Sequence, residues 1–254
     1  MKTFDDFVGL ATPAKPVLPL IHMTDGYCMR LILDQEELAP QDCPILQHPA
    51  LYFSYGRPSF RPNGKGLPTA LTSLAPVCFV IDAAAVPISK AFPFDSGAFA
   101  RKMFAASTHP KMQLKHFALA ASLDRPQQVV ETFFGSNAKY FDNIPKKDLP
   151  HAALQFEVES FLALLGDKQS ETYDDRISAV EIIADKSVLL KGAVKALVFP
   201  GQFLEDDTFK SALSALGCHP IPYSLGARFS NESCFGRISD SVRDYLVKQS
   251  LLGR

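Results

Sequence analysis

The spacing of apolar positions changes along the chain, from short continuous runs near both ends to a helical repeat in the middle. Short runs rich in Val, Ile, Leu, Phe and Tyr are typical of buried strands. Such runs predict strands over residues 17–22, 51–55, 77–82, 177–183, 194–199 and 221–225. Pro19 lies inside the first run and has no N–H to donate, so we expect this strand at a sheet edge.

The middle of the chain, about 87–170, has apolar residues at the spacing of helices instead. We expect a helix capped by Asp95 or Ser96, and further helices over 112–121, from Pro126 onward and over 151–165. Outside this region a helix capped by Thr24 or Asp25 should follow the first strand as far as about Gln35. Two more should cover 208–216, ending at Gly217, and 239–249.

This order of elements indicates the α+β class, because strands at both ends enclose a helical segment. The length of 254 residues suits a single domain, 1–254. We expect a helical insertion at about 87–170 and a C-terminal extension at about 200–254. Residues 1–15 are interpreted as a peripheral arm.

Composition narrows the class of protein without pointing to a chemistry. The net charge of −1 argues against a strongly basic nucleic-acid scaffold. The apolar runs fall far short of the roughly 20 residues that cross a bilayer, so we expect no membrane partner. The acidic N-terminus does not resemble a secretion signal, and five cysteines without a CxxC pair suit a reduced, cytoplasmic protein. No Cys or His residues stand at zinc-ligand spacing, so we expect no metal site.

Polar residues at the ends of the predicted strands are the candidates for chemistry. His22 closes the first strand and Thr24 follows it. Tyr52 and Tyr55 lie in the second strand, and Arg57 comes directly after it. The last candidate is Glu181. It lies inside a predicted apolar strand, where burying a carboxylate without a partner costs free energy. Each has a structural alternative: His22 and the tyrosines as strand residues that only pack, Arg57 as a strand end, and Glu181 facing solvent.

These residues resemble, in order and type, the ADP-ribosyltransferase superfamily, nearest to its DarT-like and PARP-like branch with a His-Tyr-Glu pattern. The first matching stretch is Leu-Ile-His-Met-Thr at 20–24, followed by a helix. The second is the aromatic strand at 51–55 with the basic stretch 57–61, and the third is the Glu181 strand with the strand after it. The resemblance spans residues 16–200 and leaves about 87–150 and the last 50 residues unmatched.

The resemblance implies a split β-sheet core and NAD as a co-substrate. His22 and Thr24 would bind NAD, with nicotinamide stacked on Tyr52 or Tyr55. Glu181 would be the catalytic carboxylate that stabilises positive charge on the ribose as the nicotinamide bond breaks. Arg57, or Arg61 in second place, would contact the pyrophosphate or position the acceptor.

Transfer of ADP-ribose to a macromolecule is therefore the leading hypothesis. The resemblance favours a DNA or RNA acceptor, a toxin or defence role, and a partner protein that inhibits the enzyme. One alternative is an NAD glycohydrolase that uses water as acceptor. Another is a non-catalytic ligand-binding or protein-binding module with the same fold.

Overall fold

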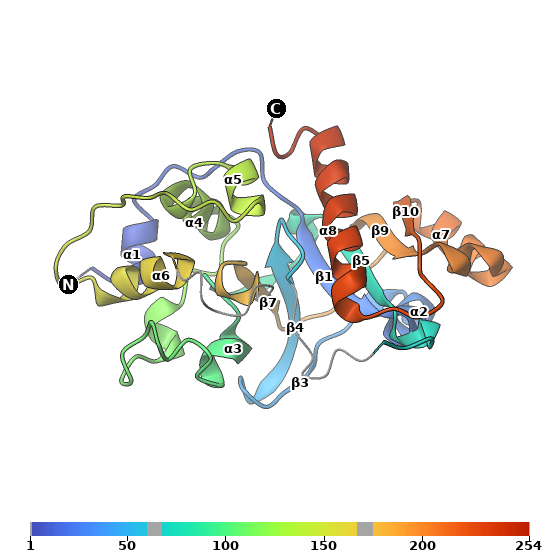
Figure 1. Ribbon diagram of the computed structural model, residues 1–254, viewed down its shortest axis with the longest axis horizontal. Helices are drawn as coiled ribbons and strands as arrows, with labels where there is room; N and C mark the ends of the chain where they lie inside the picture. The colour runs from blue at the N-terminus through green and yellow to red at the C-terminus, as the bar shows by residue number, and fades with distance from the viewer. Residues whose placement is uncertain (1, 60–67, 167–174, 254) are drawn as a thin grey trace.

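A mixed β-sheet forms the centre of the computed structural model, which describes residues 2–59, 68–166 and 175–253 (Figure 1). The neighbouring strands follow the order β10-β9-β5-β1-β4-β7-β6, and β3 pairs with the far end of β4. Their bounds are β1 Leu20–Asp25, β3 Gln41–Cys43, β4 His48–Tyr55, β5 Pro76–Ile81, β6 Ile88–Phe92, β7 Glu181–Ala184, β9 Val194–Pro200 and β10 His219–Tyr223. Apart from the parallel pair β9–β10, the neighbours run antiparallel. A separate ribbon joins β2 (Glu37–Leu38) to β8 (Val188–Leu189).

Helices pack around this sheet, so the α+β class predicted from the sequence is confirmed. The α-helices are α1 Phe4–Val8, α2 Gly26–Gln35, α3 Ser96–Ala100, α4 Asp124–Phe133, α5 Asn137–Phe141, α6 Phe156–Gly166, α7 Asp207–Leu216 and α8 Asn231–Lys248. Short 3₁₀ helices cover η1 Thr72–Leu74, η2 Ala83–Ala85, η3 Leu114–Phe117, η4 Asp175–Ile177 and η5 Gly201–Glu205. Within the described residues no helix is both long and apolar enough to cross a lipid bilayer.

The position of β1 differs from the edge position predicted for it. It pairs with β5 over all six of its residues, and Leu20 and Ile21 also pair with β4 on the other side. Pro19 precedes the first paired residue, so its missing N–H costs the sheet no hydrogen bond. The Pro19 carbonyl instead accepts a hydrogen bond from Gly56 at 2.8 Å. β1 is therefore a central strand.

The sheet divides between β1 and β4, and this division forms the candidate site. The two strands pair only at Leu20–Tyr55 and Ile21–Ser54. Beyond Ile21, β1 continues along β5, whereas β4 continues along β7 from Ser54–Glu181 to Leu51–Ala184. We call this separation the fork. Because the strands no longer share hydrogen bonds there, side chains and a ligand can enter between them.

Several local predictions hold because they depend on neighbouring residues alone. Asp25 caps α2 by accepting a hydrogen bond from the Cys28 amide at 2.8 Å, and Asp95 caps α3 in the same way. Gly217 ends α7 with a φ of +64°, a left-handed conformation that glycine adopts without strain. The predicted helix over 112–121 is wrong, since only η3 forms there. The strand predicted over 177–183 is shorter and begins at Glu181.

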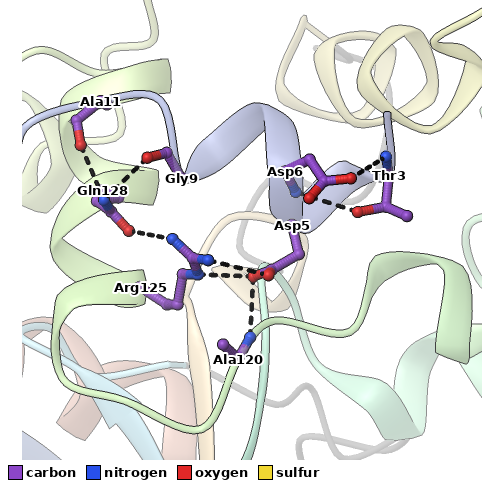
Figure 2. A network of polar contacts seen from close by, with 8 residues as sticks. All are labelled: Thr3, Asp5, Asp6, Gly9, Ala11, Ala120, Arg125 and Gln128. Atoms are coloured by element: carbon purple, nitrogen blue, oxygen red, sulfur yellow. Dashed lines mark hydrogen bonds and ion pairs between the residues drawn. The ribbon is translucent and has the colours of Figure 1, made fainter. Parts of the chain in front are cut away.

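The first residues of the chain pack into the molecule instead of forming a peripheral arm. The ring of Phe4 is buried and lies 5.7 Å from the Phe161 ring, with α1 against α4 and α6. Figure 2 shows the polar contacts that hold α1: Arg125 on α4 contacts both carboxylate oxygens of Asp5, at 2.8 and 3.1 Å, and Asp5 also accepts from the Ala120 amide. The N-terminus is thus part of the helical region in Figure 1.

The C-terminal residues also contribute to the core. Helix α8 packs on β5, β9 and β10, and its residues Ile238, Val242 and Leu246 are fully buried. An apolar stripe with this helical spacing covers one side of the sheet. Residues 96–166 hold α3 to α6, which lie on the β7 side of the sheet in Figure 1. Helix α8 therefore covers strands on the β5 side of β1, and α3 is tied to β7 by the hydrogen bond from the Ser96 amide to Glu181.

Candidate functional site

A cleft of about 1820 Å³ opens at the fork. Residues 21–25 of β1 form one side of it, and residues 50–54 of β4 form the other, with Glu181 of β7 beyond them. His22, Thr24, Tyr52 and Glu181 all line this cleft, although they come from positions up to 159 residues apart. Four of the six residues predicted for the site are therefore brought together by the arrangement of the strands.

His22 lies where β1 leaves β4. Its Nδ1 is 2.9 Å from the Tyr52 carbonyl oxygen, so the ring spans the fork. A carbonyl oxygen only accepts hydrogen bonds, so Nδ1 carries the proton and Nε2 is an acceptor in the neutral ring. The ring also packs near Phe53, with centroids 5.7 Å apart, and Phe79. The aromatic contacts and the carbonyl together set the orientation of the imidazole.

Tyr52 contacts a cysteine that sequence reasoning did not select. The Tyr52 hydroxyl lies 2.7 Å from the Sγ of Cys43, which also lines the cleft and accepts from the Leu46 amide at 3.4 Å. Burial raises the pKa of the Cys43 thiol, but the hydrogen bonds from Tyr52 and from the amides of Leu46 and Ile45 outweigh it. The pKa of this thiol therefore lies below its ordinary value.

Replacing Tyr52 by phenylalanine should raise the pKa of Cys43, because the variant loses a donor that favours the thiolate. The measurement is the alkylation rate of Cys43 against pH, followed by mass spectrometry of the labelled peptide. We expect the inflection to move to higher pH in Tyr52→Phe, while the inflection of exposed Cys28 stays in place. An unmoved Cys43 inflection would show that the hydroxyl does not stabilise the thiolate.

Glu181 is a buried carboxylate, with 5% of its surface exposed, at the start of β7. Its Oε1 accepts a hydrogen bond from the Ser96 amide, the first residue of α3, at 3.1 Å. The β6–β7 pairing places Phe92 opposite Glu181, and the chain turns into α3 just after it. The Asp95 amide donates to the Arg176 carbonyl at 2.9 Å, which ties this turn to the segment before β7. The carboxylate is therefore held by the backbone around it.

The charges that line the cleft are mostly negative. Five carboxylates belong to it, from Asp25, Asp42, Asp95, Glu181 and Glu232, and two guanidinium groups, from Arg101 and Arg176. Arg176 is buried, and Arg101 is exposed. Sequence reasoning did not select either arginine. Their signal was slight: Arg176 precedes Glu181 by five residues, and Arg101 follows the helix that Asp95 caps.

Tyr55 and Arg57 do not line the cleft. The Tyr55 ring is fully buried, its hydroxyl accepts from the Leu18 amide at 3.0 Å, and burial raises the pKa of this phenol. Arg57 is 3% exposed and donates to the Tyr140 carbonyl at 3.0 Å and to the Ser178 hydroxyl. Arg61, the second choice for the functional arginine, lies outside the described residues.

The arginine thus joins three parts of the chain around the site. Its guanidinium connects the end of β4 to α5 and to the segment that leads into β7. The Ser54 hydroxyl, from a residue paired with Glu181, donates to the Arg57 carbonyl at 2.6 Å. These contacts support the backbone on which Glu181 stands and place the guanidinium away from the cleft lining.

Metal ligation has no obvious basis in the described ranges 2–59, 68–166 and 175–253: no group of three or more His, Cys, Asp or Glu residues there could hold an ion. Among known proteins, no family model matches this chain, and no match is found among curated proteins.

Proposed function

We propose that this protein is an NAD-dependent ADP-ribosyltransferase. The observation that carries the proposal is the convergence of His22, Tyr52 and Glu181 on one cleft at the fork. These are the residues of the His-Tyr-Glu pattern, and chain distance alone gives no reason for them to meet. The cleft exceeds the roughly 300–1,000 Å³ of ordinary small-molecule sites, as a dinucleotide with an acceptor beside it would require.

In this proposal Glu181 acts on the ribose next to nicotinamide. The bond between the ribose carbon and the nicotinamide nitrogen breaks with its electron pair leaving on nicotinamide, and the ribose carbon gains positive charge. A buried carboxylate stabilises that charge more strongly than an exposed one, because water screens it less. The acceptor then bonds to the same carbon and releases its proton.

The other residues of the cleft bind and orient the substrate. Tyr52 supplies an aromatic face for nicotinamide, and the fixed ring of His22 hydrogen-bonds a ribose hydroxyl. Arg101 is the exposed guanidinium on the lining and takes the pyrophosphate role predicted for Arg57. Arg57 itself becomes a positioning residue for the Glu181 backbone. The proposal also includes a macromolecular acceptor, for which the family resemblance favours a nucleic acid. It includes a partner protein that inhibits the enzyme as well.

Replacing Glu181 by glutamine should abolish most nicotinamide release from NAD. The amide oxygen still accepts from Ser96, so the fold is kept while the negative charge is lost. We expect turnover to fall by at least about 100-fold, which corresponds to about 2.7 kcal/mol. The assay follows nicotinamide by chromatography, with macromolecular extracts as acceptors. Glu159→Gln, an exposed change on α6, is the matched control and should retain full turnover.

Three outcomes would contradict this function. Nicotinamide release with free ADP-ribose as the sole product, whatever acceptor is added, would indicate a glycohydrolase. Equal turnover in Glu181→Gln would remove the carboxylate from the chemistry. An absent thermal shift with NAD would favour a non-catalytic module, since a ligand at 100 times its dissociation constant adds about 2.7 kcal/mol of stability.

A further inference from the structure

A group of exposed apolar side chains lies next to the cleft. Tyr27 and Leu31 stand one turn apart on α2, Leu71 precedes η1, Leu74 is its last residue, and Leu204 belongs to η5. All five are exposed large hydrophobic residues. Leu31 and Leu74 also line the cleft, so the group continues into it. We call these five residues the apolar patch.

The three elements that carry the apolar patch meet at one point. Helix α2 packs against η1, and the Gly26 amide donates to the Ala75 carbonyl at 2.9 Å. A Cβ on Gly26 would lie within 3 Å of both the Thr72 carbonyl oxygen and the Phe203 ring. The first turn of α2 therefore touches both η1 and η5, so the three elements that carry the five residues lie together. Contiguous exposed apolar surface of this kind marks interaction sites.

Negative charge flanks the apolar patch on two sides. The last turn of α2 carries Asp34, and Glu36 and Glu37 follow the helix. On the other side, Leu204 is followed by Glu205, Asp206 and Asp207. The cations on these same elements are Arg30, which lies over the Tyr27 ring at 4.9 Å, and Lys210, which pairs with Asp207. Lys186 and Lys191 also lie near Glu36 and Glu37, because they flank β8, which pairs with β2. Six carboxylates are thus accompanied by four cations, of which Arg30 and Lys210 already have partners, so negative charge is in excess.

The negative charge around the apolar patch indicates which class of partner can bind there. A second copy bound through the same surface would bring the two acidic runs against each other, because a two-fold interface presents one patch to itself. A nucleic acid would meet like charge along its phosphates. A polypeptide segment that alternates large apolar residues with lysine or arginine would satisfy both features of the surface.

We propose that the apolar patch binds a cationic, amphipathic polypeptide segment beside the cleft. The binding does not depend on the reaction proposed for the cleft, since none of the five patch residues is assigned to NAD. It adds a class of partner, a basic protein segment, that approaches the cleft from the side of α2. An acceptor protein or an inhibitor that docks here would lie next to the fork.

Fluorescence anisotropy with a labelled 14-residue leucine–lysine helix tests the proposal. We expect this peptide to bind at least about tenfold more tightly than the same peptide with every lysine replaced by glutamate. The variant Leu31→Gln/Leu71→Gln should weaken binding at least about tenfold. Leu154→Gln is the matched control, because Leu154 is 61% exposed and Leu71 is 62% exposed, and Leu154 lies on neither the patch nor the cleft. Its affinity should equal that of the wild type.

Two double variants that remove negative charge distinguish specific binding at the patch from nonspecific electrostatic attraction of the peptide to the protein. Glu36→Gln/Glu205→Gln should weaken binding and lower its salt dependence, whereas Asp148→Asn/Glu159→Gln, with equal charge lost elsewhere, should not. Equal effects of both pairs would overturn the proposal, as would tighter binding of a 20-nucleotide DNA or of the glutamate peptide. Self-association abolished by Leu31→Gln/Leu71→Gln would show that a second copy occupies the patch. Nicotinamide assays are separate, so loss of NAD turnover leaves this result unaffected.

Discussion

Arg57→Leu should destabilise the protein by about 3 kcal/mol or more. The guanidinium is buried and donates to carbonyls of α5 and to the Ser178 hydroxyl, and the variant removes all of these hydrogen bonds. Hydrogen bonds from a charged group contribute roughly 1.5–3 kcal/mol each, and buried acceptors left without a donor cost more than exposed ones. The measurement is urea unfolding, and the transition midpoint should fall with little change in its slope.

The control for this result is Arg243→Leu. Arg243 forms an exposed ion pair with Asp142 at 3.1 Å, and such pairs contribute roughly 0–1 kcal/mol. The two variants therefore compare the loss of a buried, hydrogen-bonded guanidinium with the loss of an exposed ion pair. If Arg57→Leu kept wild-type stability but lost NAD binding, the positioning role would be contradicted. Arg57 would then be assigned to binding the pyrophosphate of NAD.

Phe94→Ala should cost about 3–5 kcal/mol of folding free energy, the range found for large aromatic side chains removed from a core. Phe94 is fully buried at the turn between β6 and α3. Its ring lies 5.5 Å or less from those of Phe99, Phe104 and Phe117. Removing it leaves a cavity among rings that belong to several elements. Thermal unfolding should show a fall of roughly 10 °C for a chain of this length.

Phe156→Ala provides the comparison, because Phe156 is half exposed at the start of α6 and should change stability by roughly 0.5 kcal/mol or less. A loss below about 1 kcal/mol in Phe94→Ala would mean that the ring cluster closes around the gap. A normal midpoint with reduced turnover would instead show that Phe94 acts through Ser96 on Glu181.

Much of the candidate site could be predicted because its residues stand on recognisable strands. His22, Tyr52 and Glu181 each stand out locally as polar residues in apolar runs, and Asp25 and Asp95 cap the helices that follow. Arg57 follows the end of β4 after one glycine, as the strand predicted over 51–55 implies. Its direction could not be predicted, because the groups that receive its hydrogen bonds are 83 and 121 residues further on.

Contacts between distant segments also explain why some residues of the cleft and of the apolar patch could not be predicted from the sequence. Cys43 is an ordinary cysteine in the chain, and only the pairing of β3 with β4 brings its sulfur to the Tyr52 hydroxyl. The apolar patch joins α2, η1 and η5, and no local pattern connects those three segments. Contacts between distant segments are chosen by which surfaces bury together, and a short window of sequence does not contain that information.

The sequence by itself determined most of the helices and strands, several of their caps and the class of fold, since apolar spacing and capping act over a few residues. It did not determine α1 or α5, and it predicted a helix over 112–121 where only η3 forms. The tertiary structure decided that β1 is central, that β1 and β4 separate after two pairs, and that Arg57 turns inward. Strand order follows from the burial of whole faces against one another, which compares distant parts of the chain. The cleft at the fork exists because of that order.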